Sequence, residues 1–186
     1  MGRRPMPWDR GGRPYKCIWH PPIYKTILNF FCPTEFSAER FFMDIIFDVD
    51  GTLMDIEHRR HFVTQRPKDF KSFREHTKFD TRKEDVFAIA DSLQAQGHRI
   101  LISTGRIKSE HDITVKQIRD GGIDFEKIYM RSDTDYRPDD ELKEGYLEKM
   151  RRDGYTPTIA FDDRQRVVDM FRSKGLTVFQ VDEGDF

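Results

Sequence analysis

Short apolar runs alternate along the chain with longer segments in which apolar residues recur at helical spacing. In the longer segment at 83–97, Val86, Ile89, Ala90 and Leu93 fall on one face of a helix. The same patterns predict strands at 44–49, 98–103, 127–130, 156–161 and 176–181, and helices at 83–97, 108–122, 138–154 and 163–175. Strands that alternate with helices indicate an α/β fold, in which a mostly parallel central sheet lies between two helical layers.

Residues 1–42 differ in composition from the rest of the chain. They are rich in Gly, Pro and Arg at the start, and Pro21, Pro22 and Pro33 interrupt the segment that follows. Such a composition predicts a partly flexible extension in front of a single compact domain at 43–186. Aromatic residues in this extension would let part of it pack or bind a partner.

The bulk composition fits a soluble protein. Of the 186 residues, 35% are charged and 37% are hydrophobic, and the formal net charge of -1 excludes a uniformly basic nucleic-acid-binding protein. No apolar run is long enough to span a bilayer, so we expect no membrane partner. Cys17 and Cys32 offer no disulfide framework and lack a convincing set of further zinc ligands, which favours a reducing, cytoplasmic location.

Polar and charged side chains follow four of the predicted strands. They are Asp48 and Asp50 after the first strand, Ser103, Thr104, Gly105 and Arg106 after the second, Arg131, Ser132 and Asp133 after the third, and Asp162, Asp163 and Arg164 after the fourth. In parallel sheets, ligands bind beyond the carboxyl ends of the strands. The sequence therefore predicts one site at this rim, rich in carboxylates, arginines and hydroxyl groups.

Carboxylates from two strand ends suit a magnesium ion, which takes hard oxygen ligands from protein, substrate and water. A divalent cation would also offset the repulsion between Asp48 and Asp50. An aspartate with an ordinary pKa of roughly 3.9 is ionised near neutrality and can act as a nucleophile. The second aspartate can act as a general acid if its surroundings keep it protonated, while Thr104 and a lysine hold phosphoryl oxygens.

Four motifs resemble those of the haloacid dehalogenase (HAD) phosphohydrolase superfamily, and they occur in the order typical of it. "FDVDGTL" at 47–53 is similar to the first motif, D-x-D-G-T after an apolar strand, and "ILISTGR" is similar to the second, with Thr104 as its hydroxyl. Lys143 in "PDDELK" resembles the third motif, and "AFDDR" resembles the acidic fourth. The resemblance implies a HAD-like (Rossmannoid) three-layer sandwich.

Residues 44–186 further resemble the phosphatase half of phage-type polynucleotide kinase–phosphatases, although the likeness weakens between Met54 and Asp85. It is carried by "DGTL", "STGR", "RPDDELK" and a final stretch that begins "FDDRQRVVDMF" and closes in "GDF". The resemblance implies that Asp48 is a nucleophile that forms an aspartyl-phosphate, and that Asp50 is the acid and then the base for water. No Gly-Lys pair occurs in the chain, so we expect a phosphatase without the kinase's phosphate-binding loop.

The resemblance also implies sets of ligands. Magnesium would be held by Asp48, the backbone carbonyl of Asp50 and one or both of Asp162 and Asp163, with Asp163 favoured. The substrate phosphate would be bound by Thr104, Gly105, Arg106, Lys143 and Arg164, and accessory contacts would come from Asp133, Arg59 and Arg60.

Structural explanations of the same residues stay open at this point. Thr104 could cap a following helix, and Arg106 could form a surface ion pair. Lys143 could be no more than the i,i+4 partner of Asp139 on one helix. The two aspartates of the first motif could be turn formers at a strand end.

A basic insertion at about 54–82 separates the first two motifs, where HAD enzymes place a cap or flap. Its central part, 57–78, carries seven Lys or Arg and three His against three acids, which suits a polyanionic substrate. Phe62, Phe70 and Phe73 would stack on a base, or else Phe70 and Phe73 would lie in the core beneath an amphipathic helix. Because the insertion is short, we expect an open site that admits an oligonucleotide end.

Together these features predict a magnesium-dependent phosphatase that acts on nucleic-acid or nucleotide phosphates, with a polynucleotide 3′-phosphate end as the preferred substrate. The alternatives are a mononucleotide phosphatase for 5′- or 3′-nucleotides and a catalytically silent module that binds nucleic-acid ends. The sequence leaves open the choice between DNA and RNA, the 3′ or 5′ preference and the oligomeric state.

Overall fold

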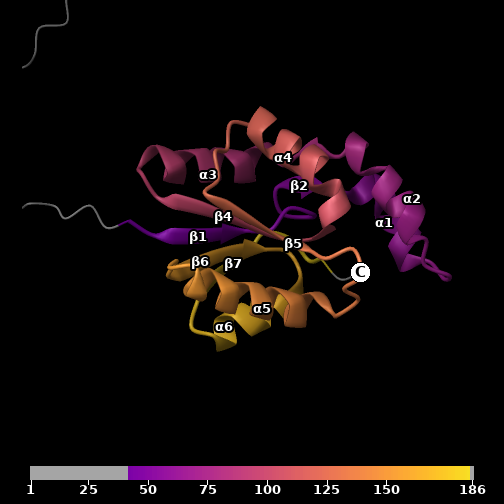
Figure 1. The fold of residues 1–186 in the computed structure, drawn as a ribbon. Helices are drawn as coiled ribbons and strands as arrows, with labels where there is room; N and C mark the ends of the chain where they lie inside the picture. The colour runs from indigo at the N-terminus through magenta and orange to yellow at the C-terminus, as the bar shows by residue number, and fades with distance from the viewer. Residues whose placement is uncertain (1–41, 185–186) are drawn as a thin grey trace, which may run out of the picture. The chain divides into compact units, whose positions relative to one another are not determined.

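The computed structural model describes residues 42–184, so the expected extension at 1–42, with Cys17 and Cys32, lies outside the described part except for Phe42. In that part, five strands form one sheet in which every neighbouring pair is parallel, in the order β5-β4-β1-β6-β7. The strands are β1 (Asp44–Phe47), β4 (Arg99–Ile107), β5 (Lys127–Arg131), β6 (Pro157–Asp162) and β7 (Thr177–Gln180) (Figure 1).

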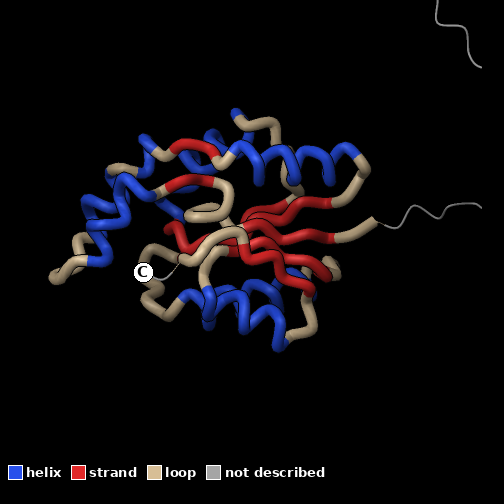
Figure 2. Tube along the Cα trace, turned by 180° about the vertical axis from the view of Figure 1, so that it is seen from behind, coloured by secondary structure: helices blue, strands red, loops and turns tan. Residues whose placement is uncertain are grey.

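Two pairs of helices cover the two faces of this sheet. The helices α3 (Glu84–Ala95) and α4 (His111–Asp120) lie on one face, and α5 (Asp139–Arg152) and α6 (Gln165–Ser173) lie on the other (Figures 1 and 2). The expected α/β fold with three layers is therefore confirmed. None of the helices within residues 42–184 is long and apolar enough to cross a membrane.

Alternate residues of β1 point into two separate apolar cores. Ile45 and Phe47 pack in one core with Phe87 of α3, whereas Ile46 packs in the other with Phe171 of α6. All four residues of β1 are buried, because the strand is central and helices cover both faces of the sheet. This double burial explains why the apolar run at 45–47 is uninterrupted.

β4 is longer than the strand predicted at 98–103, because it continues to Ile107. Its pairing with β5 shifts between Thr104 and Ile107, which pair with the consecutive residues Met130 and Arg131. Such a bulge bends a strand and re-aims its side chains. Arg106 lies in this irregular part of β4, at the carboxyl end of the sheet.

A small cap, defined here as residues 54–82, precedes α3. Its base is an antiparallel ribbon of β2 (Met54–Asp55) and β3 (Thr81–Arg82). Between these strands lie α1 (Glu57–Thr64), α2 (Phe70–Glu75) and the 3₁₀ helix η2 (Thr77–Phe79). Figure 1 shows α1 and α2 beyond the end of the sheet toward which β1 runs. The sequence patterns predicted neither short strand.

Candidate active site

Three carboxylates meet where β1 and β6 end. Asp48 follows β1, Asp162 is the last residue of β6, and Asp163 follows it. All three are buried, and each offers one oxygen within 4.8 Å of the others. β1 and β6 are neighbours, and the order of the strands reverses between them, which is where α/β sheets bind ligands. The fold therefore brings together acids that the sequence placed on two separate strand ends.

A buried lysine neutralises part of this negative charge. Lys143 Nζ, on α5, lies 2.7 Å from Asp48 Oδ1 and 2.8 Å from Asp162 Oδ2. Burial lowers the pKa of Lys143, but the two carboxylates outweigh burial and raise the pKa, so the lysine stays charged. No ion pair joins Lys143 to Asp139 within residues 42–184, contrary to the alternative of a simple i,i+4 pair.

Three acids and one lysine leave an excess of negative charge in this cluster. Burial raises the pKa of Asp48 well above its ordinary value, although Lys143 opposes the rise. Burial, together with the neighbouring Asp162, raises the pKa of Asp163 to about 6. In both cases burial and the neighbouring acids outweigh the positive charge of Lys143, and a divalent cation would supply more positive charge.

The donor atoms of the cluster fit a hard divalent cation. Both oxygens of Asp162 are engaged, one by Lys143 Nζ and the other by the backbone N–H of Arg164 at 3.1 Å. Asp163 Oδ2 is buried and has no hydrogen-bond partner among the described residues. Carboxylate oxygens suit magnesium better than they suit softer metals. Asp48, Asp162 and Asp163 therefore form a candidate acidic metal site.

Two glycines enclose the carboxylate of Asp163. A Cβ placed on Gly51 would lie 2.2 Å from Asp163 Oδ2, and one placed on Gly184 would lie 1.8 Å from the same atom. Gly51 also has a φ of +85°, in the left-handed region that favours glycine. Lys83 Nζ donates to the Gly51 carbonyl at 3.0 Å and pairs with Asp182 at 2.8 Å. The glycine of the first motif is thus required by close packing against a carboxylate of the candidate metal site.

Asp50 pairs with two arginines instead of joining the acidic cluster. Its Oδ1 accepts hydrogen bonds from Arg59 Nη2 at 2.7 Å and from Arg106 Nε and Nη2 at 2.9 and 2.6 Å. Burial alone would raise the pKa of Asp50, but the two guanidinium groups outweigh it and lower the pKa. The protonated form that a general acid needs is therefore not the resting state of Asp50. The metal-binding role of its backbone carbonyl stays a prediction.

Asp80 completes a buried network of charges around Asp50. Its carboxylate accepts hydrogen bonds of 2.7 Å from both Arg59 and Arg106, and His58 Nε2 lies 2.9 Å from it. Because Arg59 and Asp80 belong to the cap and Arg106 to β4, the network ties the cap to the sheet. Arg106 is buried, so the alternative of a surface ion pair is wrong. Asp80 could not be predicted from the sequence, because a lone acid at the end of a basic insertion belongs to no motif.

Asp139, the first residue of α5, lies between two further arginines. Its Oδ1 accepts a hydrogen bond from Arg131, and its Oδ2 lies 2.5 Å from Arg164 Nη1. Arg131 also donates to the carbonyl of Gly105 at 3.1 Å. From the sequence, Asp139 was considered only as a partner of Lys143, and Arg131 was placed at the rim without a specific role. The available signal was that α5 begins at the same rim as the strand ends.

The second motif contributes backbone and an arginine to the cavity wall. Gly105 and Arg106 line the cavity. Thr104 lies fully buried inside β4, where it caps no helix, and its hydroxyl accepts a hydrogen bond from the Arg106 N–H at 3.2 Å. It is not among the residues that line the cavity, so its contact with phosphate stays a prediction.

Of the two remaining accessory residues, one lines the cavity and the other does not. Asp133 lines the cavity, and its carboxylate accepts a hydrogen bond from the Ser109 N–H at 3.2 Å. Arg60 lies outside the cavity lining and forms an ion pair with Glu57 at 3.2 Å. The structure thus brings Asp133 to the site and leaves Arg60 beside it.

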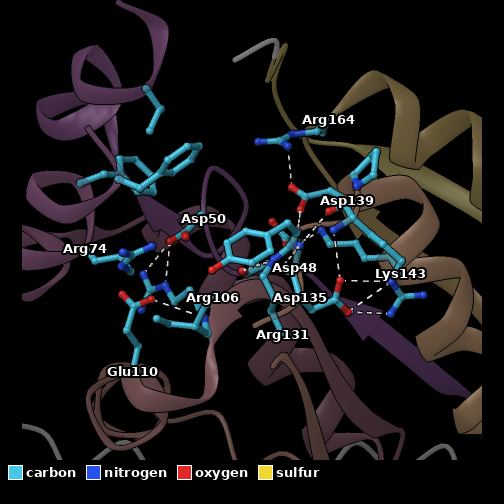
Figure 3. A pocket seen from close by; sticks show the side chains of 18 of the residues that line it. Asp48, Asp50, Arg74, Arg106, Glu110, Arg131, Asp135, Asp139, Lys143 and Arg164 are labelled. Atoms are coloured by element: carbon cyan, nitrogen blue, oxygen red, sulfur yellow. Dashed lines mark hydrogen bonds and ion pairs between the residues drawn. The ribbon is translucent and has the colours of Figure 1, made fainter. Parts of the chain in front are cut away.

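Most of the charged groups described above, but not Arg60, Asp80 or Asp162, line one cavity of about 630 Å³ between the cap and the carboxyl ends of the strands. In Figure 3, Asp48 lies near the middle above Arg131, with Asp50, Arg106, Arg74 and Glu110 on one side and Lys143, Asp139 and Arg164 on the other. From the cap, Phe70 and Phe73 also line the cavity. No residue of α2 is buried, so the alternative that places both phenylalanines in the core is wrong.

Comparisons with known proteins identify the family of this chain. Residues 43–186 match the family described as "Polynucleotide kinase PNKP phosphatase domain". A chain in the "Structure of the Pnkp1/Rnl/Hen1 RNA repair complex" is 25% identical, with a TM-score of 0.62 over 86% of this chain and 48% of that chain. A chain in the "Structure of Pnkp1/Rnl/Hen1 complex" is 24% identical, with a TM-score of 0.64 over 90% and 58%. The present chain therefore spans about half the length of these two chains.

A more distant likeness concerns the fold alone. The "Crystal structure of a predicted phosphatase from Clostridium acetobutylicum" is 16% identical, with a TM-score of 0.55 over 77% of this chain and 86% of that chain. It supports the HAD-like arrangement of sheet and helices expected from the four motifs.

Proposed function

The chain belongs to the family of polynucleotide kinase PNKP phosphatase domains, and on this premise we propose that it is a magnesium-dependent phosphatase that removes 3′-phosphates from polynucleotide ends. One observation carries the proposal, which is the setting of Asp48. This buried carboxylate lines the cavity, lies 2.7 Å from Lys143, and shares a metal-sized cluster with Asp163. A nucleophile, a cation that holds it and a metal site are therefore available at one point.

We assign magnesium to Asp48 and Asp163. Asp162 is already engaged on both oxygens, whereas Asp163 Oδ2 has no partner among residues 42–184. When bound, magnesium would neutralise these carboxylates and the charge of the substrate phosphate, so that Asp48 can ionise despite its burial.

Asp48 acts as the nucleophile in the first step. Its carboxylate oxygen attacks phosphorus and forms an aspartyl-phosphate, while the bond from phosphorus to the 3′ oxygen breaks and that oxygen takes a proton from Asp50. Lys143 orients Asp48 and offsets negative charge on the phosphoryl oxygens. In the second step a water gives a proton to Asp50 and attacks phosphorus, which releases inorganic phosphate and restores Asp48.

Asp50 must gain a proton before the first step, although Arg59 and Arg106 favour its ionised form in the protein without substrate. Arg59 and Arg106 donate only to Oδ1, so Oδ2 has no donor from the described part of the chain and can carry the proton. A phosphate dianion that enters the cavity adds negative charge beside Asp50 and raises its pKa. The same arginines then stabilise the carboxylate that remains when the proton leaves.

The charge of the cavity mouth supports a polynucleotide as the substrate. Lys68, Arg74 and Arg166 line the cavity, and none of them forms an ion pair with an acid among residues 42–184. A phosphodiester chain would place further phosphates near these cations, whereas a mononucleotide would leave them unused. One similar chain comes from an RNA repair complex, which also favours a nucleic-acid end here.

Phosphate release from matched substrates tests the proposal. The protein is incubated with magnesium and one oligonucleotide that carries either a 3′- or a 5′-phosphate, in DNA and RNA forms, and with 3′- and 5′-mononucleotides. Fastest release from the 3′-phosphorylated oligonucleotide supports the proposal, and equal rates on oligonucleotides and mononucleotides point to a mononucleotide phosphatase. Binding without release, with any divalent metal, would identify a silent end-binding module. Asp48→Asn is the control, because it removes the nucleophile at nearly constant volume.

A further inference from the structure

Tyr136 displays its ring to solvent from a loop that is firmly held. The residue is 89% exposed and lines the cavity. Arg131 Nη1 donates to the carbonyl oxygens on either side of it, at 3.0 Å for Asp135 and 2.7 Å for Arg137. Arg137 also pairs with the Asp135 carboxylate at 2.6 Å. The backbone on both sides of Tyr136 is therefore fixed, while its ring takes no part in either apolar core.

Phe70 offers a second exposed ring from the cap side of the same cavity. It is the first residue of α2, is 52% exposed, and lines the cavity. Lys68 Nζ lies 5.9 Å from the centroid of its ring. Phe79 makes a useful comparison, because it is also in the cap and is 58% exposed but does not line the cavity.

Cations without an acidic partner among the described residues share the cavity with the two rings. Lys68, Arg74 and Arg166 line the same cavity without an acidic partner in the described part of the chain. The carboxylates of Asp50 and Asp139, in contrast, are each held by two arginines. Cations that follow a phosphodiester backbone, combined with exposed rings that stack on bases, are the means by which proteins bind single-stranded nucleic acid.

We propose that Tyr136 stacks on the base of the terminal, phosphate-bearing nucleotide and that Phe70 supplies a second stacking surface from the cap. This inference rests on the proposed function, since it assigns positions to the substrate of that site. Stacking uses the flat face that every base has, so the subsite responds to the presence of a base and not to its identity. Tyr136 is thus a specificity-determining residue that favours nucleotide ends over other phosphate monoesters.

The experiment uses two 3′-phosphorylated oligonucleotides that differ only in the last residue, which carries either a base or an abasic tetrahydrofuran sugar. The ratio kcat/KM with magnesium is measured on both for the wild-type protein, Tyr136→Ala, Tyr136→Phe and Phe70→Ala. Phe79→Ala is the matched control, because it removes an equally exposed cap phenylalanine outside the cavity lining. Dissociation constants for the same oligonucleotides are measured by fluorescence anisotropy in EDTA, without turnover.

Tyr136→Ala should lower kcat/KM for the base-bearing end by roughly 5- to 150-fold, mainly through KM, and leave the abasic end unchanged. Phe70→Ala should act in the same direction, while Tyr136→Phe and Phe79→Ala should match the wild type. If Tyr136→Ala lowers kcat/KM equally for the base-bearing and the abasic end, or lowers it for neither, the assignment is overturned. If the wild type releases phosphate from neither end, the proposed function fails. Anisotropy then decides the role of Tyr136, which is refuted unless Tyr136→Ala weakens binding of the base-bearing end alone.

Discussion

Lys143 Nζ lies 2.7 Å from Asp48 Oδ1 and shares its charge with Asp162 Oδ2 at 2.8 Å. One buried ammonium group on α5 therefore connects the ends of β1 and β6. Both of its partners, Asp48 and Asp162, belong to the candidate metal cluster. The stability of the site and its chemistry depend on the same contact.

Lys143→Met should abolish phosphatase activity and lower the free energy of unfolding. The variant leaves Asp48 and Asp162 buried without their cation, and breaking a buried pair from one side costs about 3–5 kcal/mol. Because the carboxylates can protonate, the loss should be largest at pH 8 and shrink toward pH 4.5. Urea denaturation across this range measures it, with Lys149→Met on the exposed side of the same helix as the control. A variant as stable as the wild type at pH 8 would contradict the prediction.

Gly51→Ala should weaken metal binding beyond its effect on folding. A Cβ at Gly51 would lie 2.2 Å from Asp163 Oδ2, so the carboxylate must move. Gly122→Ala is the matched control, because Gly122 has a φ of +89° against +85° for Gly51 but nothing lies within 4 Å of an added Cβ. Both variants should lose roughly 1–2 kcal/mol to backbone strain. Only Gly51→Ala should lose the rise in melting temperature during a magnesium titration, and equal responses would remove Gly51 from the metal site.

Asp163→Asn should stabilise the metal-free protein above pH 6. Burial raises the pKa of Asp163 to about 6 from the ordinary 3.8, so the folded state binds this proton more tightly than the unfolded state does. The stabilisation that comes from this tighter proton binding is fully present below pH 3.8 and is lost as pH rises through 6. Asparagine does not ionise, so it has no such loss. At pH 8 in EDTA, the free energy of unfolding of the variant should exceed that of the wild type by up to about 3 kcal/mol.

The difference between Asp163→Asn and the wild type should shrink toward pH 4.5, where the wild-type carboxyl is protonated when folded. Urea denaturation in EDTA from pH 4.5 to 8 tests this. Magnesium should then reverse the order at pH 8, because it raises the melting temperature of the wild type but not that of the variant. A difference that does not change with pH would mean that the carboxylate of Asp163 is not destabilised in the fold.

Arg106→Lys should fail to preserve the site although it keeps the charge. The guanidinium group donates through all three of its nitrogens at once, to Asp50, Asp80, Thr114 and Gln117. A single ammonium group cannot span these acceptors. We expect kcat to fall at least about tenfold, because the Asp50 carboxylate left after proton transfer loses the donors that stabilise it, and the free energy of unfolding to fall by about 1–3 kcal/mol through unsatisfied buried groups.

The pH dependence of the Arg106→Lys effect has a defined sign. The pKa of Asp50 lies below its ordinary value, since Arg106 and Arg59 outweigh burial, so its contribution to stability is present near neutrality. That contribution is lost as pH falls through the folded-state pKa. Wild type and variant should therefore converge in acid. Arg151→Lys, on the surface of α5, is the control, and a variant with normal kcat at pH 7 would refute the assigned role.

Much of the fold could be predicted because its signals are local. The helix predicted at 83–97 occurs as α3 (Glu84–Ala95), since its apolar spacing and final glycine act within single turns. The strand predicted at 98–103 was too short, because the continuation to Ile107 depends on a bulge formed against β5. β2 and β3 were missed, since strands of two residues carry no periodic pattern.

By itself, the sequence determined which carboxylates end the central strands and that a lysine and arginines would accompany them, because motif spacing and apolar runs act over a few residues. Only the tertiary structure decided which charges pair. In the fold, Lys143 pairs with Asp48 and Asp162 and not with Asp139. Arg59 and Arg106 pair with Asp50 and hold it ionised. These partners lie far apart along the chain, and the packing of the cap and α5 against the sheet brings them together. Because these groups are buried, the partner of each one determines whether it is charged.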